Sequence, residues 1–287
     1  MQASAGLAYL TGTEPGRVAQ IAIVAMITLS AAVSVSFGLR RGIQRLSNAN
    51  VVLATGLLLF VLVAGPGASI LGLLIRDVGN YMLDLPGLAN WGGRKDTLFL
   101  KNWTHFYWAW WIAWAPFVGM FIARISKGRT VREFVVGVVA APFGAAVLWI
   151  CVFGETAIAQ YDAGKGDIAD GVSDLSMVLF STLANLPAAA LTSTISLILV
   201  VLFITTSADS GALVANAVTR KGKEVRSSSG RLFWALFLGL TGSALLVGGG
   251  KNALQALQAA SIIAGTPFAL ILIAACGALL LEFRNES

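Results

Sequence analysis

The side chains best suited to chemistry in this sequence are aromatic and lie close together, between residues 103 and 117. On a helix that advances about 100° per residue, several of them share one face roughly 100° wide, with Trp108 beside it. These residues are Tyr107, Trp110, Trp111 and Trp114. A trimethylammonium group has no N–H to donate, and the face of an indole attracts it by about 0.5–2 kcal/mol per ring. The pattern is therefore compatible with a site for a methylated cation.

A second interpretation of the same aromatic residues is structural. Tryptophan is enriched where membrane helices meet the headgroups. This explains Trp103 and Phe106, near the predicted outer end of the helix. It explains Trp111 and Trp114 less well, because they lie two to three turns farther in, below the headgroups. From the pattern alone, a cation site and an aromatic belt both stay open.

A second polar stretch runs from Phe203 to Gly211 and reads Phe-Ile-Thr-Thr-Ser-Ala-Asp-Ser-Gly. Serine and threonine are ordinary packing residues between membrane helices, so a structural role is one interpretation. The other is an ion site, because a carboxylate such as Asp209 is costly inside a membrane and marks functional positions. Hydroxyls, together with carbonyls freed by a broken helix, are ligands for Na⁺. The residues by themselves favour neither interpretation.

The elements that must position these residues are membrane spans. Hydrophobic residues make up 57% of the chain and charged residues 12%, and the mean hydropathy is +0.80. Such values are typical of an all-α integral membrane protein, a multi-span helical bundle with one transmembrane domain over residues 1–287. The net charge of +6 comes from basic residues in short loops, where they set orientation, so it does not indicate nucleic-acid binding. Seven spans are predicted near residues 18–39, 51–75, 103–125, 131–153, 188–216, 232–247 and 254–281.

Local signals mark the boundaries of these spans. Thr130 and Glu133 form a predicted capping box at the start of the fourth span. Pro187 is predicted to separate a short amphipathic helix over residues 174–184 from the fifth span. Another short amphipathic helix is predicted over residues 77–85, and a break in the last span at residues 265–267. Basic connectors at residues 40–47 and 220–231 are predicted to be cytoplasmic, and a turn is predicted at residues 248–250.

The sequence argues against an enzyme. A membrane enzyme acting on choline lipids could also use an aromatic cage, but it would need a nucleophile, a general base or a metal cluster. His105 is the only histidine, and apart from Glu133 at the start of the fourth span, Asp209 is the one carboxylate within a predicted span. We therefore expect no enzymatic activity.

Residues 106–130, Phe-Tyr-Trp-Ala-Trp-Trp-Ile-Ala-Trp-Ala-Pro-Phe-Val-Gly-Met-Phe-Ile-Ala-Arg-Ile-Ser-Lys-Gly-Arg-Thr, resemble the signature helix of the betaine/choline/carnitine transporter family. The resemblance extends from Ala5 to the last span. It implies that Trp111 contributes to an aromatic box around the substrate ammonium. It also implies that Trp110 and Trp114 line the permeation path, flanked by Phe106 and Trp108. The expected substrate is a quaternary ammonium compound: choline, glycine betaine or carnitine.

The stretch around Thr206 is similar to the family's sodium-site helix. The resemblance implies that Thr206 and Ser207 ligate Na⁺ through their side chains and Phe203 through its backbone, while Phe117 lies near a second sodium site. Asp209 is expected to orient the helix rather than to coordinate the ion. The resemblance further implies a LeuT-type inverted-repeat fold that works by alternating access, with Na⁺ as the coupling ion and no other cofactor. It also implies a homotrimer with a multi-pass location in the inner or plasma membrane and a role in osmoprotection.

The sequence also departs from the family. Family members have about twelve spans in two inverted repeats, and the glycine-rich unwound helix with the other box residues lies in the first half. No Gly-x-Gly-x-Gly stretch flanked by apolar residues occurs here. The chain is therefore expected to be the C-terminal portion of a member and not to transport by itself. The alternative is a non-transporting fragment or regulatory subunit of such a transporter. The sequence also leaves open whether transport is coupled to sodium or to protons.

Overall fold

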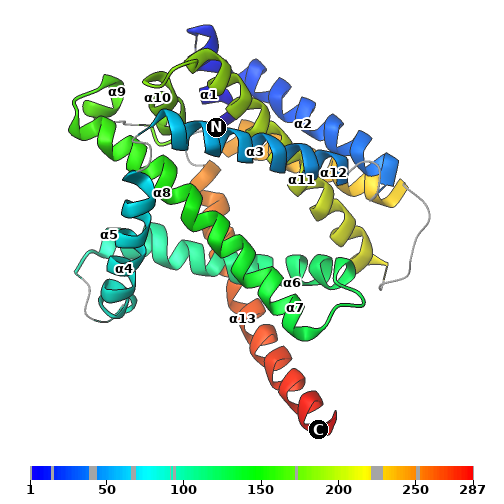
Figure 1. The fold of residues 1–287 in the computed structure, drawn as a ribbon. Coiled ribbons are helices and arrows are strands. Elements are labelled where there is room, and N and C mark those ends of the chain that lie inside the picture. The colour runs from blue at the N-terminus through cyan, green and yellow to red at the C-terminus, as the bar shows by residue number, and fades with distance from the viewer. Residues whose placement is uncertain are drawn as a thin grey trace. The chain divides into compact units, whose positions relative to one another are not determined.

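The computed structural model describes residues 2–13, 16–38, 44–65, 69–90, 92, 95–171, 174–220, 229–249 and 253–286. All the regular secondary structure in these ranges is helical, as predicted (Figure 1). The elements are α1 (Gln2–Thr11), α2 (Arg17–Gly38), α3 (Gln44–Ala64), α4 (Ser69–Ala89), α5 (Thr97–Phe99), η2 (Leu100–His105), α6 (Phe106–Ile125), α7 (Val131–Val135), η3 (Val136–Ala140), α8 (Ala141–Asp162), α9 (Gly166–Ala169), α10 (Val178–Ala184), α11 (Ala189–Thr219), α12 (Ser229–Gly249) and α13 (Ala253–Glu286).

Among the described residues, seven helical segments are long and apolar enough to cross a membrane. They are Arg17–Ser36, Gln44–Ala64, Thr97–Ala123, Val131–Asp162, Ala189–Thr219, Ser229–Gly248 and Gln258–Glu282. A span of the hydrocarbon core takes about 20 residues, so each of these segments suffices. The prediction of an all-α, multi-span membrane protein is confirmed.

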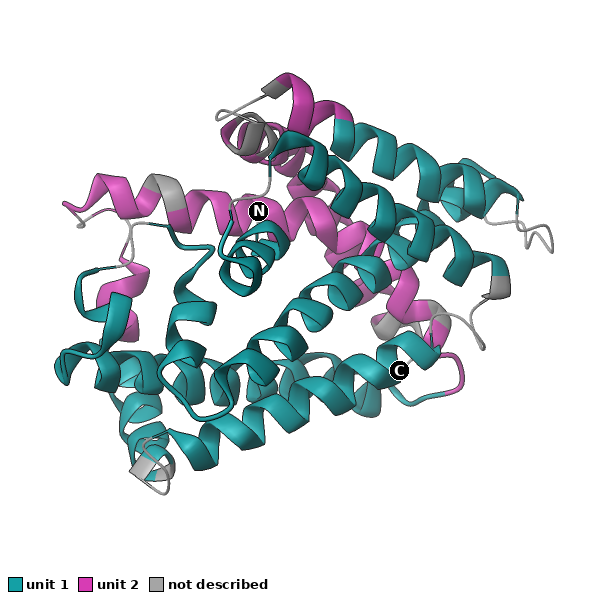
Figure 2. Cartoon of the chain, turned by 90° about the horizontal axis from the view of Figure 1, so that it is seen from above, with its two compact units in different colours: residues 1–84, 129–243 teal, residues 85–128, 244–287 magenta. Residues whose placement is uncertain are grey.

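The chain divides into two compact units (Figure 2). Unit 1 contains Met1–Asp84 and Arg129–Ser243, and unit 2 contains Leu85–Gly128 and Ala244–Ser287. Each unit therefore combines segments that lie far apart in the sequence. In unit 1, α11 packs against α1, α2, α3 and α10, whereas unit 2 is built from α6 packed against α13.

The core of unit 1 forms where the spans converge on α11. Its buried apolar residues are Leu57, Val61, Ile70, Val152, Leu183 and Leu199, from α3, α4, α8, α10 and α11. Close to it, the buried ring of Phe180 fills the space beside Gly6 of α1, and Tyr9 stacks on the same ring at 6.1 Å between centroids. Burial of these side chains holds α1, α10 and α11 together.

A polar network joins the ends of α8, α9 and α10. Gln160 Nε2 donates to the carbonyl oxygen of Thr182 at 3.1 Å, and Asn185 Nδ2 donates to Gln160 Oε1 at 3.1 Å. The amide of Asn185 also lies 3.4 Å from the carbonyl oxygen of Lys165, which precedes α9. Buried amides with partners fix the chain path between α8 and α11.

Two local predictions are confirmed. The Thr130 side chain accepts from the Glu133 backbone N–H, and the Glu133 side chain accepts from the Thr130 backbone N–H, which is a complete capping box at the start of α7. Beyond Pro187, Ala188 adopts a left-handed conformation (φ 56°), and α11 begins at Ala189. The proline therefore separates α10 from α11, as expected.

Other helix bounds differ from the expected ones. The second span ends at Ala64 rather than near Ile75, because Gly65-Pro66-Gly67 follows it and these residues disfavour a helix interior. The apolar residues after this point belong to α4, so the expected short helix over residues 77–85 is only part of a longer one. In α13 the helix continues through residues 265–267 without a break, although Pro267 lies inside it.

Several orientation signals lie outside the described residues. Arg40, Arg41, Lys221, Lys223 and Arg226 belong to this group, as does Gly250 of the predicted turn. The helix α12 continues through Gly248 and Gly249, so the predicted turn does not begin at those residues. The connector predicted over residues 40–47 is helical from Gln44 onward.

Candidate functional site

The aromatic residues of α6 form a continuous row of ring contacts. Trp110 stacks on Trp114 at 6.1 Å between ring centroids and 13° between ring planes. The row continues toward the N-terminus, where Trp103 stacks on Tyr107 at 5.7 Å and Phe106 stacks on Trp110 at 6.2 Å. Side chains three and four positions apart on a helix are neighbours, so this spacing brings the rings together. The face predicted from periodicity is present.

Trp111 and Trp114 form a corner within this row. Their ring centroids are 6.0 Å apart and their planes meet at 71°, close to a right angle. Two rings held nearly perpendicular present two adjacent walls, which is the geometry that aromatic cages use around a methylated ammonium. We call this pair the indole corner.

The indole corner is open on the side away from α6. Trp111 is 58% exposed and Trp114 is 43% exposed. Trp108, at 69%, is more exposed than either. Unit 2 therefore contributes two walls of a cage and does not enclose a ligand by itself.

The opposite face of α6 packs against α13. A Cβ atom on Gly265 would lie 2.8 Å from the carbonyl oxygen of Ala109 and 3.2 Å from its Cα, so the two helix backbones approach closely at this point. At about 100° per residue, Ala109 lies roughly opposite the mean direction of Trp111 and Trp114. Ala109 of α6 thus packs on α13, and the indole corner is presented away from it.

The helix that carries the aromatic residues has one irregular segment in its described part. α6 is helical from Phe106 to Ile125 although Pro116 lies inside it. The irregularity is η2 at Leu100–His105, a π-helical segment that contains Trp103 and leads directly into α6. Such segments are frequent near functional sites.

The predicted sodium ligands lie on α11 in unit 1. The hydroxyl of Thr206 contacts the carbonyl oxygens of Leu202 at 3.1 Å and Phe203 at 3.0 Å. It also accepts from Asn50 Nδ2 of α3 at 3.3 Å. Ser207, one position on, is exposed.

These groups fit a partial donor set for Na⁺. A backbone carbonyl and the side chains three and four residues later share one side of a helix. α11 is continuous from Ala189 to Thr219, so no break in the helix frees the carbonyl of Phe203 in this structure. The second lone pair of the Phe203 carbonyl is approached by the Thr206 hydroxyl at 3.0 Å, so this carbonyl can face an ion when that hydroxyl donates to Leu202 alone.

Phe117, predicted to lie near a second sodium site, is on α6 in unit 2 and is 37% exposed. The other predicted sodium ligands are in unit 1. Phe117 and the α11 residues belong to different units, so the assignment of Phe117 to a second sodium site stays a prediction.

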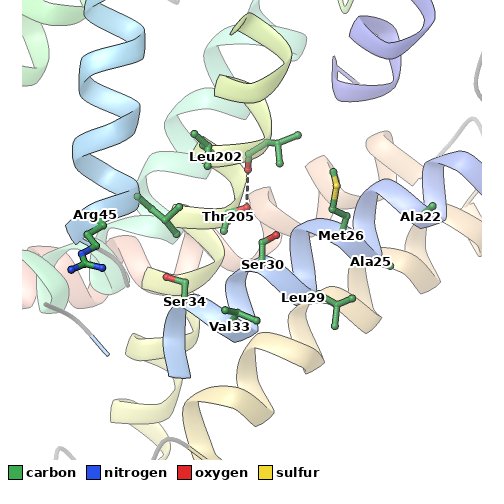
Figure 3. A pocket seen from close by; sticks show the side chains of 12 residues that line it. Ala22, Ala25, Met26, Leu29, Ser30, Val33, Ser34, Arg45, Leu202 and Thr205 are labelled. Atoms are coloured by element: carbon green, nitrogen blue, oxygen red, sulfur yellow. Dashed lines mark hydrogen bonds between the residues drawn. The ribbon is translucent and has the colours of Figure 1, made fainter. Parts of the chain in front are cut away.

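A different face of α11 is turned toward α2. Asp209 and Thr205, one helical turn apart, are 0% and 1% exposed. The Ser34 hydroxyl of α2 faces the Asp209 carboxylate, but neither group has a partner in hydrogen-bonding geometry. Ser34 and Thr205 line a cavity of about 770 Å³ between α2, α3 and α11 (Figure 3).

Sequence reasoning missed the partners that the fold brings to α11. Asn50 and Ser34 lie more than a hundred residues before it, and no local pattern links them to Thr206 or Asp209. A signal was present in the sequence, since Asn50 is an amide close to the start of an apolar span. In the structure Asn50 is 3% exposed. Buried amides in membranes generally have a polar partner in the bundle.

Comparison with known proteins gives consistent matches over the whole chain. The family model described as betaine/carnitine/choline family transporter matches residues 1–287. A glycine betaine/proline/choline transporter of Vibrio parahaemolyticus is 41% identical over 99% of this chain and 51% of its own length. Glycine betaine transporter 1 of the same organism is 43% identical over 99% of this chain and 54% of its length.

A more distant relative is the high-affinity choline transport protein of Escherichia coli, which is 37% identical over 95% of this chain and 41% of its own length. The chain thus spans about half the length of the curated relatives that it matches.

Proposed function

Because the chain belongs to the betaine/carnitine/choline transporter family, we propose that the protein containing it carries a quaternary ammonium compound, such as choline or glycine betaine, across the cell membrane. The chain itself is a multi-pass membrane segment. The family is one of transporters and not of enzymes, in agreement with the prediction from the sequence.

The observation that carries this proposal is the indole corner. Trp111 and Trp114 meet at 71°, and their side chains are 58% and 43% exposed, with Trp114 also stacked on Trp110. A trimethylammonium group is attracted to both faces without any hydrogen bond, by about 0.5–2 kcal/mol per ring. The remaining walls come from outside unit 2, in keeping with a chain that covers about half of its relatives.

Within this proposal the other aromatic residues have lesser roles. Trp110 stacks between Phe106 and Trp114 and so holds the corner in place. Trp108 projects from the side of the row and flanks the path. We assign Trp110 a positioning role because it stacks on two neighbouring rings, those of Phe106 and Trp114.

We further propose that uptake is coupled to sodium and proceeds by alternating access. The hydroxyls of Thr206 and Ser207 and the carbonyl of Phe203 would hold the ion on α11. Sodium supplies positive charge that stabilises one arrangement of the helices over another, and such differential affinity is what couples a gradient to transport.

The proposal is tested by uptake of radiolabelled choline and glycine betaine into proteoliposomes that contain the full-length protein, with and without a sodium gradient. We expect sodium-dependent accumulation by the wild type. In Trp111→Ala the KM for substrate should rise about 2- to 30-fold, the range that one cation–π contact supplies. Uptake of neither compound by the wild type would contradict the function, and an unchanged KM in the variant would contradict the site.

A further inference from the structure

Asp209 is a buried carboxylate for which the proposed transport mechanism gives no use. It is 0% exposed, and both carboxylate oxygens have no hydrogen-bond partner. Within the described residues no ion pair joins it to a cationic side chain, and Arg45 is the only charged residue lining the cavity beside it. An isolated buried carboxylate costs several kcal/mol or more, so the group is either neutralised by a proton or balanced by a bound cation.

The neighbouring hydroxyl of Ser34 is also unpaired, in contrast to those of Thr28 and Ser36 on the same helix. Thr28 and Ser36 of α2 each donate to the carbonyl four residues earlier, at 2.7 Å. Ser34 makes no such bond although it is 4% exposed. Serine in a membrane helix generally bonds back to its own helix. Its hydroxyl is therefore kept free on the side that faces Asp209.

Thr205 supplies a third oxygen on the same side. Its hydroxyl proton is used in a bond to the carbonyl oxygen of Val201 at 2.8 Å, which Figure 3 shows as a dashed line. The oxygen of Thr205 can then only accept or ligate. Since Thr205 and Asp209 are one turn apart, their oxygens lie on the same face of α11.

From these three side chains we infer a binding site for one small monovalent cation of the size of Na⁺, held by Asp209, Ser34 and Thr205 between α2 and α11. A single carboxylate balances a single positive charge, and hydroxyl oxygens complete a hard-cation donor set. Ser34 and Thr205 also line the cavity between α2, α3 and α11, so these two hydroxyl-bearing residues lie beside open space. This revises the expectation that Asp209 only orients the helix.

The inferred site differs from the one proposed above for transport. At about 100° per residue, the mean direction of Thr205 and Asp209 lies roughly 130° around α11 from that of Phe203, Thr206 and Ser207. Thr206 instead contacts Asn50 of α3. Separate substitutions can therefore abolish each of the two sites without changing the side chains of the other.

The test is equilibrium binding of ²²Na⁺ to the purified full-length protein without substrate. Asp209→Asn should lose one bound Na⁺ per chain, and Ser34→Ala should weaken that binding about 3- to 10-fold, the loss of one polar contact of about 1 kcal/mol. Ser36→Ala is the matched control, since its hydroxyl bonds only to Ala32, and it should bind like the wild type. The Asp209-dependent ion should persist in Thr206→Val.

Equal stoichiometry in Asp209→Asn and the wild type would overturn the inference. The inference would also be overturned if Asp209 bound a proton in place of Na⁺. Proton uptake that is lost in Asp209→Asn and is not reduced by added Na⁺ would show this. Ser34→Ala gives an independent answer should Asp209→Asn not fold, because an unchanged affinity in that variant also contradicts the site. Choline uptake is measured separately, so failure here leaves the proposed function intact.

Discussion

Among single residues, Trp111 and Trp114 are those whose uncharged rings can take the place of a counter-ion for a methylated cation. The indole corner has no hydrogen-bonding role in the described part of the chain, and its two rings contact each other edge to face. Such a pair binds a methylated cation through its ring quadrupoles and discriminates by charge as well as by shape.

The hydroxyl of Thr206 provides a test of sodium coupling. Thr206→Val keeps the volume and removes the oxygen, so we expect the sodium concentration for half-maximal uptake to rise at least about fivefold, the equivalent of roughly 1 kcal/mol. The measurement is choline or glycine betaine uptake as a function of sodium concentration.

Thr194→Val is the matched control for this variant. Its hydroxyl donates to the carbonyl oxygen of Ala190 at 2.7 Å on the same helix, in an exposed position. The control should leave the sodium dependence unchanged. A sodium dependence that is equally unchanged in Thr206→Val would remove Thr206 from the ion site.

The sequence predicted these residues unevenly. The aromatic face follows from local periodicity, so its row of rings could be predicted before any fold was known. The contacts of Asn50 with Thr206 and of Ser34 with Asp209 could not, because they depend on how α3 and α2 pack on α11.

At the scale of elements, α13 positions the aromatic helix. The helices touch at Gly265, where a side chain has no room, whereas Gly277 of the same helix faces open space. The indole corner is thus held from behind by a contact that contains no aromatic residue.

Gly265→Ala should therefore destabilise unit 2 by about 1–3 kcal/mol, because its Cβ would meet the backbone of Ala109 and the helices would have to separate. Gly277→Ala should instead raise the free energy of unfolding by about 0.5–1 kcal/mol, because alanine is a better helix former than glycine. Unfolding of the full-length protein in detergent measures both variants. A Gly265→Ala variant as stable as Gly277→Ala would show that the close approach is not required.

Element boundaries were predicted where the chain carries explicit signals. The Thr130 and Glu133 capping box and the break at Pro187 are local, and both occur where expected. The π-helical segments η2 and η3 and the length of α4 have no such local signal in the sequence.

At the scale of the whole molecule, α11 is the axis of unit 1. Its 31 residues give a helix about 46 Å long, more than the hydrocarbon core requires. It carries two separate polar faces, one toward Asn50 and one toward Ser34. We expect α11 to couple ion binding to substrate transport. The homotrimer implied by the resemblance stays a prediction.

The 287-residue chain alone should not accumulate substrate. The indole corner supplies two walls of a cage, and the chain covers about half of its relatives. We expect uptake by proteoliposomes of the full-length protein and none by those of the 287-residue chain at equal protein content. Sodium-driven accumulation by the short chain would show that the site is complete without further residues.

The most direct test of the central claim compares choline with its neutral isostere, 3,3-dimethylbutan-1-ol, as ligands of the full-length protein. The wild type should prefer choline, Trp111→Phe should retain part of that preference, and Trp111→Leu should lose about 2- to 30-fold of it while binding the neutral compound nearly as before. An equal loss for both ligands would show that Trp111 supplies only volume, and the cation–π account of this helix would be wrong.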